Sequence, residues 1–292
     1  MYDRILLPTD GSDVAEAASE TAVAFARRFD ADLRAIHVRE PAELPTGVAA
    51  GEGAADRYDG GERATERVAE LAADAGVDVT TAVRDREDSV HGTILAYADR
   101  HDADCIVMGT HGRTGLDRLA LGSVAERTLR ESPVPVVTVH GDTAVDPDLD
   151  AVLVPTDDSD PARAAADHAV DLATATGATL HTVHVVDVTA FGAGADAPQV
   201  LDALREAGRR AIDEVVDRAE AADVSAVEAS VLSGAPHDAI LDYADEYDTD
   251  CIVLGTHGRT GVSRYLLGSV AERVVRLADV PVIVIPSPET AD

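Results

Sequence analysis

The sequence contains no Lys, no Asn and no Trp, and aromatic residues make up only 3% of its 292 residues. A core must therefore be built mainly from Val, Ile, Leu and Ala, and the length suggests two domains. No apolar run reaches the roughly 20 residues that a membrane-spanning helix needs. The chain enters a strand pattern directly after Met1, so we expect no signal peptide, no membrane partner and a cytoplasmic location.

Cysteine is almost absent, since it occurs only as Cys105 and Cys251. The two residues stand at matching places in the two halves of the chain, each at the start of an apolar strand pattern. Neither has a cluster of other metal ligands beside it. This placement predicts two buried thiols rather than a disulfide or a zinc site.

Positive charge is also scarce, because 24 basic residues, all Arg, stand against 55 acidic residues, a net charge of -31. Such a surface repels nucleic acid, so we expect no nucleic-acid partner. It also destabilises the folded state in dilute salt, whereas a Debye length of about 3 Å at 1 M salt screens the repulsion. Asp and Glu are spread along the whole chain rather than gathered in a tail. We therefore interpret the chain as a halophile's protein, adapted to a salty archaeal cytoplasm.

An internal repeat organises the sequence. The matching segments are ILLPTD at 5–10 with VLVPTD at 152–157, CIVMGTHGRTG at 105–115 with CIVLGTHGRTG at 251–261, and LGSVAER at 121–127 with the same letters at 267–273. Two domain-sized units indicate a tandem duplication rather than a solenoid. We predict a first domain at 1–141, an acidic linker at 142–150 and a second domain at 151–287.

Each repeat alternates strand and helix patterns. In the first repeat we predict strands at 3–8, 32–38, 77–83, 105–109 and 134–139, helices at 13–28, 62–75, 89–101 and 123–131, and a Gly/Ala/Pro-rich loop at 41–61. The second repeat continues the pattern through a strand at 280–285. This alternation predicts an α/β fold, with two tandem doubly wound, Rossmann-like domains of the adenine-nucleotide-binding type. Each has a five-stranded parallel sheet, helices on both faces and its ligand at the carboxyl edge.

A glycine pattern, G-x2-G-x9-G-S, follows the fourth strand of each repeat and ends where a helix begins. Its members are Gly109, Gly112, Gly122 and Ser123 in the first repeat, and Gly255, Gly258, Gly268 and Ser269 in the second. Glycines let the backbone approach a ligand closely, and a helix N-terminus offers free N–H groups to an anion. Arg113 and Arg259 inside the loops could clamp phosphate oxygens. The alternative is a surface loop with glycine caps, but the spacing, the context and the duplication favour an anion site.

This pattern, together with a first strand ending in Pro-Thr-Asp, resembles the ATP-binding branch of the universal stress protein family (UspA type), across both repeats. The resemblance implies adenine nucleotide, as ATP, AMP or ADP, with Asp10 facing the ribose and phosphates, Val38 meeting the adenine and Met108 flanking the nucleotide. The candidate residues of the first repeat are Pro8, Thr9, Asp10, Val38, Met108, Gly109, His111, Gly112, Arg113, Gly122, Ser123 and Val124. Those of the second are Thr156, Asp157, Val185, Leu254, Gly255, His257, Gly258, Arg259, Gly268, Ser269 and Val270.

Two acidic features bear on these sites. A carboxylate such as Asp10 at a strand end is often only a helix cap, but at this edge Asp10 or Asp157 could also hold Mg²⁺ with the nucleotide. The repeats differ one residue later, where Gly11 is matched by Asp158. A second carboxylate beside the phosphates repels a nucleotide unless a metal intervenes, so we expect the second site to be the weaker one in the absence of metal.

The histidines do not predict an enzyme. His37 and His184 lie in apolar strands and are expected in the core, whereas His111 and His257 lie in the motif loops and could reach a ligand. No His is paired with a nucleophile or a carboxylate at a recognisable spacing, so no catalytic residue is predicted. The leading hypothesis is an ATP-binding stress-tolerance or regulatory module. The alternatives are a slow ATPase or nucleotide transferase, and a scaffold that binds no nucleotide. The resemblance further implies that the repeats pair as a pseudo-dimer through 134–139 and 280–285, with a further homodimer also open.

Overall fold

The computed structural model describes residues 1–40, 53–112, 121–141, 143, 149–188, 197–258 and 267–287. Residue contacts divide the chain into two compact units, Tyr2–Pro147 and Asp148–Asp292, with Met1 assigned to the second. The division falls between two residues of the predicted linker.

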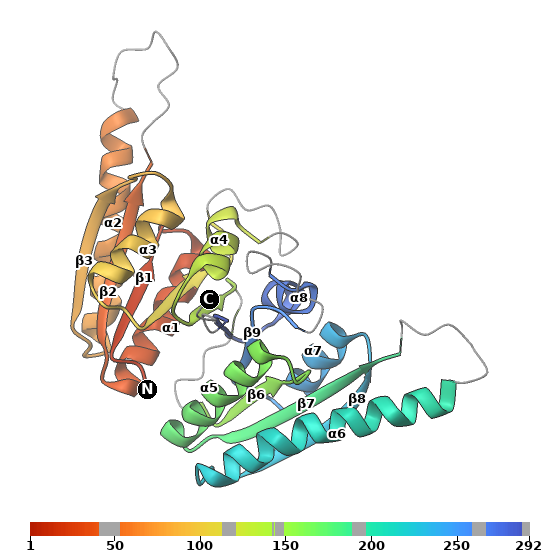
Figure 1. Ribbon diagram of the computed structural model, residues 1–292. Helices are drawn as coiled ribbons and strands as arrows, with labels where there is room; N and C mark the ends of the chain where they lie inside the picture. Colours follow the sequence, from red (N-terminus) through yellow and green to blue (C-terminus); the bar gives the residue numbers. More distant parts are fainter. Residues whose placement is uncertain are drawn as a thin grey trace. The chain divides into compact units, whose positions relative to one another are not determined.

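The first unit contains a parallel sheet with the strand order β3-β2-β1-β4-β5 (Figure 1). Its strands are β1 (Arg4–Pro8), β2 (Asp32–Arg39), β3 (Val79–Asp85), β4 (Cys105–Gly109) and β5 (Val136–Val139). The chain moves outward from β1 to β3 and then returns to β4 on the other side of β1. The strand order therefore reverses between β1 and β4, the switch point at which doubly wound folds bind ligands.

In the described part of this unit, helices connect the strands and cover both faces of the sheet (Figure 1). They are α1 (Asp13–Phe29), α2 (Gly53–Asp74), α3 (Val90–Arg100) and α4 (Ser123–Glu131). Helix α1 packs beside α2, and α3 packs beside α4. Right-handed crossovers account for this division. The connections β1–β2 and β2–β3 run across the sheet in one direction, whereas β3–β4 and β4–β5 run in the other, so their helices lie on opposite faces.

The second unit repeats the arrangement with the order β10-β9-β6-β7-β8, again parallel. Its strands are β6 (Ala151–Pro155), β7 (Thr179–Asp187), β8 (Val227–Gly234), β9 (Cys251–Gly255) and β10 (Val282–Ile285). Its helices are α5 (Asp160–Thr176), α6 (Ala197–Ala221), α7 (Pro236–Glu246) and α8 (Ser269–Leu277). The predicted fold class, two tandem doubly wound α/β units, is confirmed.

The largest error in the predicted element boundaries is the start of the second helix, which was expected at residue 62. Residues 41–61 were expected to form a loop, but α2 begins at Gly53, so only 41–52 fall before it, and these lie outside the described residues. Gly60 and Gly61 lie inside the helix, where glycine normally weakens helix formation. The strand expected at 77–83 is shifted to Val79–Asp85, and the strands expected at 134–139 and 280–285 each begin two residues later.

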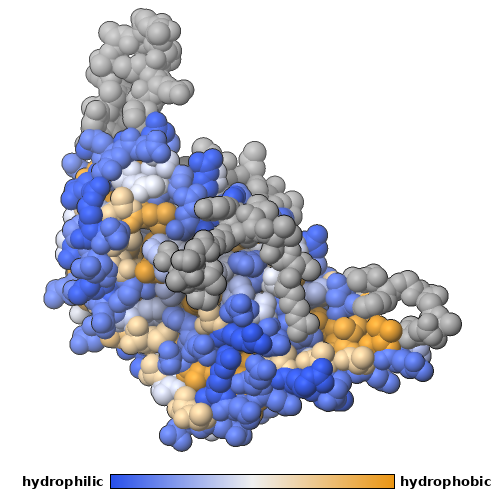
Figure 2. All heavy atoms as spheres, viewed as in Figure 1, coloured by the Kyte–Doolittle hydropathy of each residue, from blue (hydrophilic) through white to orange (hydrophobic). Residues whose placement is uncertain are grey.

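The central strands form the core as continuous apolar runs. Ile5, Leu6 and Leu7 are fully buried, as the two covered faces of a parallel sheet require. Cys105 and Cys251 are also fully buried and free, which confirms the predicted thiols, and burial raises the pKa of both. Hydrophilic residues cover most of the face shown in Figure 2. No helix in the described part of the chain is both long enough and apolar enough to cross a bilayer.

Candidate functional site

Strands β1 and β4 separate before their carboxyl ends. The two strands pair only at Ile5 with Cys105 and at Leu6 with Ile106. Beyond Leu6, β1 continues beside β2 to Pro8, while β4 continues beside β5 to Gly109. The turns after β1 and β4 therefore leave the sheet at the same edge, on either side of the switch point. Strands β6 and β9 separate in the same way after Leu153.

The turn after β1 holds Asp10 by one of its two carboxylate oxygens. The backbone N–H and the hydroxyl of Ser12 donate to Asp10 Oδ1 at 3.0 and 2.7 Å. The Ser12 hydroxyl oxygen also accepts from the N–H of Ala15 at 3.3 Å, so Ser12 is the N-cap of α1. The reading of Asp10 as the helix cap is therefore wrong. Ser12 caps the helix, and Asp10 is oriented by Ser12.

The second oxygen of Asp10 lies against the loop that follows β4. A methyl group built on Gly112 would lie 2.5 Å from Asp10 Oδ2, a separation too short for any side chain. At Gly258 a methyl group would meet Asp157 Oδ2 in the same way. The first glycine of the motif is also tightly packed, because a methyl group at Gly109 would lie 2.8 Å from Val14 Cγ1. The motif glycines are thus required by close approach to the turn after β1 and to α1.

The third glycine of the motif begins the helix that follows the loop. Gly122 is the N-cap of α4, and its N–H donates to the carbonyl oxygen of Thr110 at 2.8 Å. A methyl group at Gly122 would lie 3.1 Å from both that oxygen and the Cα of His111. No side chain caps α4 in the described structure, which leaves the amides of its first turn, from Ser123 and Val124 onward, without a side-chain partner at the cap. Uncapped amides at a helix N-terminus are suited to binding an anion.

The structure brings most of the predicted residues of the first repeat to one edge of the sheet. Pro8, Thr9 and Asp10 leave β1 there, and Gly109 to Gly112 leave β4. The register Pro8 with Ile36 places Val38 two residues farther along β2, at the same edge. Met108 is buried in β4. Arg113 and Arg259 lie outside the described residues, so their predicted contact with phosphate stays a prediction.

Sequence reasoning missed a polar contact behind the loop. Thr110 is buried, and its hydroxyl lies 2.9 Å from His140 Nδ1 and 3.3 Å from His111 Nδ1. His140 follows β5, which ends beside β4, so only the sheet order could have revealed it. In the second repeat Thr256 contacts His257 Nδ1 at 3.1 Å and the hydroxyl of Ser287 at 3.0 Å. The two loops are nearly identical in sequence, but their threonine hydroxyls form hydrogen bonds with different residues after the last strand, His140 in the first repeat and Ser287 in the second.

The second repeat builds the same turn with one added charge. The Ser159 N–H donates to Asp157 Oδ1 at 3.1 Å and its hydroxyl donates at 2.5 Å. Asp158 takes the left-handed backbone conformation of Gly11, with φ 65° against 74°. Its carboxylate accepts from Arg163 Nη2 at 2.6 Å. Arg163 thus provides a counter-charge to Asp158, and Asp158 in turn raises the pKa of Arg163. The expected weakness of the second site stays a prediction.

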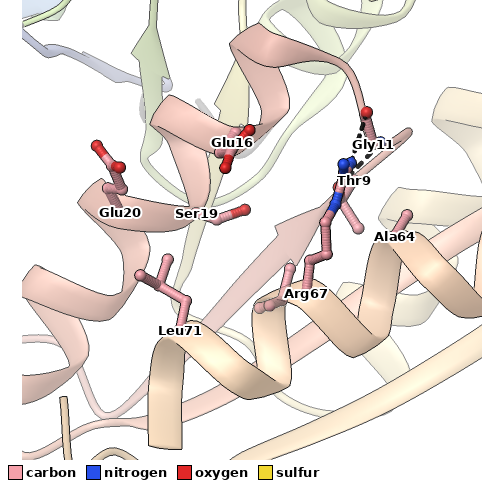
Figure 3. Close-up of a pocket in the computed structure, with 9 residues that line it drawn as sticks. Thr9, Gly11, Glu16, Ser19, Glu20, Ala64, Arg67 and Leu71 are labelled. Carbon is pink, nitrogen blue, oxygen red and sulfur yellow. Dashed lines mark hydrogen bonds between the residues drawn. The ribbon is translucent and has the colours of Figure 1, made fainter. Parts of the chain in front are cut away.

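In the first repeat, an arginine from a different helix donates a hydrogen bond to the turn after β1. Arg67 Nη2, on α2, donates to the carbonyl oxygen of Gly11 at 2.7 Å (Figure 3). The residues beside this contact, among them Glu16 on α1, line a cavity of about 60 Å³. Arg163 and Glu214 stand at the equivalent places of the second repeat and form an ion pair at 3.6 Å. The charges at these two helix positions are therefore reversed between the repeats: Arg163 takes the place of Glu16, and Glu214 takes the place of Arg67.

A divalent cation has few protein ligands at this edge. No group of three or more His, Cys, Asp or Glu suited to a metal occurs among the described residues. Ser12 and Ser159 donate to Oδ1 of Asp10 and Asp157, and Oδ2 of each Asp lies close to the glycine segment that follows the fourth strand of its repeat. A magnesium ion would fit here only as part of a nucleotide complex, with phosphate oxygens supplying most of its ligands.

The fold and the strand order define a tandem pair of doubly wound units, each with a glycine-rich segment after the strand at its switch point. The model of the universal stress protein family matches residues 1–140 and 149–286. The chain belongs to this family, as a member with two tandem domains.

Some relatives match one repeat of the chain, and others match nearly all of it. The chain is 39% identical over 141 residues to universal stress protein MJ0531 of Methanocaldococcus jannaschii, covering 47% of this chain and 82% of that protein. It is 30% identical over 295 residues to a universal stress protein of Mycolicibacterium smegmatis, covering 96% of each. The solved structure of a universal stress protein from Archaeoglobus fulgidus superimposes with a TM-score of 0.72 and 25% identity, over 99% of this chain and 98% of that one.

Proposed function

We propose that each repeat binds an adenine nucleotide, ATP in the first place and AMP or ADP as alternatives. The protein would act as a nucleotide-dependent stress-tolerance or regulatory module. The observation that carries the proposal is the approach of the Asp10 carboxylate to Gly112 across the switch point, repeated at Asp157 and Gly258. This contact brings together the two segments from which the predicted nucleotide site is built.

The proposed roles follow from the position of each group. The amides at the start of α4 and the backbone at Gly112 would hold the phosphates, while Asp10 Oδ2 would accept from a ribose hydroxyl or share Mg²⁺ with the phosphates. Val38, at the end of β2, would meet the adenine through its backbone. Positions 157, 185 and 258 and the start of α8 repeat these groups in the second repeat.

Binding without rapid turnover is the form of the function that we favour. Among the described residues, His111 and His257 have threonine hydroxyls as their hydrogen-bond neighbours, and neither is bonded to a carboxylate that would orient it as a general base. A slow ATPase or nucleotide transferase would use the same loops and the same ligand.

One experiment separates these functions. Purified protein would be incubated with radiolabelled ATP and Mg²⁺ in molar KCl, and retained and converted nucleotide would be measured together. Retention of ATP without product supports the binding module, and steady formation of ADP or of a transfer product shows an enzyme. No retention of ATP, AMP or ADP refutes the proposal and leaves a scaffold.

We also propose that the protein is cytoplasmic and that its repeats pair as the equivalent of a homodimer. The apolar composition of the last strand of each repeat, Val136–Val139 and Val282–Ile285, supports this pairing. Sedimentation equilibrium in molar KCl measures whether two chains associate further. A mass of one chain, 30.4 kDa, is expected if pairing within the chain satisfies both strands.

A further inference from the structure

A histidine ring contacts the turn that carries Asp10. His37 lies on β2 immediately before Val38, and its Nδ1 is 2.8 Å from the carbonyl oxygen of Thr9. A carbonyl oxygen can only accept a hydrogen bond, so Nδ1 carries the proton and donates it. His184 makes the same contact with the carbonyl oxygen of Thr156, also at 2.8 Å. His184 is buried, as the sequence predicted, whereas His37 is half-buried.

The accepting carbonyl belongs to the peptide unit that joins Thr9 to Asp10. Thr9 is buried, and its N–H donates to the carbonyl oxygen of Ile36 at 2.9 Å. Its hydroxyl accepts from the N–H of Gly11 at 3.2 Å. The ring of His37 adds a contact on the carbonyl side, so three contacts hold Thr9, and that of His37 is made to the peptide that joins Thr9 to Asp10. The direction in which Asp10 leaves β1 is set by that peptide.

A glycine inside α2 makes room for the ring. A methyl group at Gly61 would lie 2.5 Å from His37 Cδ2, and one at Gly208 of α6 would collide with His184 Cδ2. Glycine inside a helix is less favourable than Ala by about 1 kcal/mol. The close packing of the histidine ring accounts for a glycine at position 61 despite this cost. The neighbouring Gly60 has no atom within 4 Å of such a methyl group, and the second repeat has Ala207 at that place. Only the glycine that faces the ring is present in both repeats.

We propose that His37 and His184 are positioning residues of the two nucleotide sites. Each ring N–H holds the peptide that aims Asp10 or Asp157 at the glycine loop, and Gly61 or Gly208 admits the ring between the sheet and the helix. The inference rests on the proposed nucleotide binding and adds residues that contact no ligand themselves.

Two substitutions of similar size test the hydrogen bond. The amide nitrogen of His37→Asn can occupy the place of Nδ1 and donate, whereas His37→Leu removes the donor. In a Gly258→Val background that leaves only the first site, ATP should bind to the Asn variant within about twofold of the unsubstituted His37, and to the Leu variant roughly five- to tenfold more weakly, the equivalent of one hydrogen bond. A purely structural role would lower the unfolding temperature of both variants without separating their affinities.

The glycine gives a second test with a matched control. Gly61→Ala raises helix propensity but forces the ring to move, so the affinity of the first site should fall severalfold. Gly60→Ala, one residue away in the same helix, should leave that affinity unchanged because its methyl group meets open space. Equal affinities in the Gly61→Ala and Gly60→Ala proteins would overturn the inference.

A readout without nucleotide distinguishes this inference from the proposed function. The Ser12 N–H donates to Asp10 Oδ1, so its hydrogen exchange reports whether the turn is held. Exchange should be faster in nucleotide-free His37→Leu than in His37→Asn, and equal rates would refute the positioning role. If the protein retains no nucleotide, the proposed function fails, while the exchange rates still decide the role of His37.

Discussion

Adding one methyl group at Gly112 tests the contact on which the proposed site depends. The methyl carbon would lie 2.5 Å from Asp10 Oδ2. Non-bonded heavy atoms prefer separations of about 3.5 Å, so the oxygen must retreat by roughly 1 Å. The other oxygen is held by Ser12 at 2.7 and 3.0 Å, and a movement of that size breaks at least one of these bonds.

The expected effect is modest for folding and larger for binding. Loss of one such hydrogen bond lowers the free energy of unfolding by about 1 kcal/mol. The displaced carboxylate would also lose its contact with the nucleotide, so Gly112→Ala should weaken ATP binding at the first site by about tenfold or more. Calorimetry in a Gly258→Val background measures the affinity, and denaturant unfolding in molar KCl measures the stability.

The double variant identifies the cause. Asp10→Ala removes the oxygen that collides, so Gly112→Ala combined with Asp10→Ala should be no less stable than Asp10→Ala alone. Gly60→Ala serves as the glycine control. The reasoning is refuted if Gly112→Ala binds ATP within twofold of that control and unfolds at the same denaturant concentration.

Three further predictions concern charge and the thiols. With a net charge of -31, the protein should lose helical circular dichroism in dilute buffer and regain it in molar KCl, and a thermal midpoint independent of KCl would contradict this. Arg163→Gln should weaken the second site by exposing Asp158, and adding Asp158→Gly should restore it. Calorimetry in a Gly112→Val background, which leaves only the second site, measures both affinities for ATP. An affinity left unchanged by Arg163→Gln would count against this prediction. Cys105 and Cys251 should react with a thiol reagent at pH 8 only after unfolding, because burial raises the pKa of both and keeps them protonated, so rapid labelling of folded protein would be inconsistent with the structure.

The periodic parts of the fold could be predicted from sequence because the relevant signals are local. The apolar runs around Leu6 and Ile106 predict buried strands, and the alternation with helices predicts parallel pairing. Helix α2 was placed too late because its glycines were interpreted as loop residues. Gly61 faces the ring of His37 instead, and the distance between them in the chain hides that contact from any local pattern.

The candidate site was predictable only as a set of residue types. The motif glycines and Asp10 could be named, because the pattern and the strand order bring them to one edge. Their contacts could not be, since the ion pair of Asp158 depends on the direction of the Arg163 side chain, and the hydrogen bond of Thr110 depends on His140 at the end of another strand. Side-chain direction and long-range pairing are properties of the folded chain.

The duplication within one chain frees each site to change alone. In a homodimer of single repeats, every substitution alters both sites at once. Here the positions of Arg67 and Glu214 are encoded separately, and they have taken opposite charges while the Pro-Thr-Asp turns and the glycine loops have stayed alike. A mutation can thus change the helix that supports one turn without disturbing the other. The two proposed sites, present once each in every chain, can therefore diverge in ligand preference and affinity.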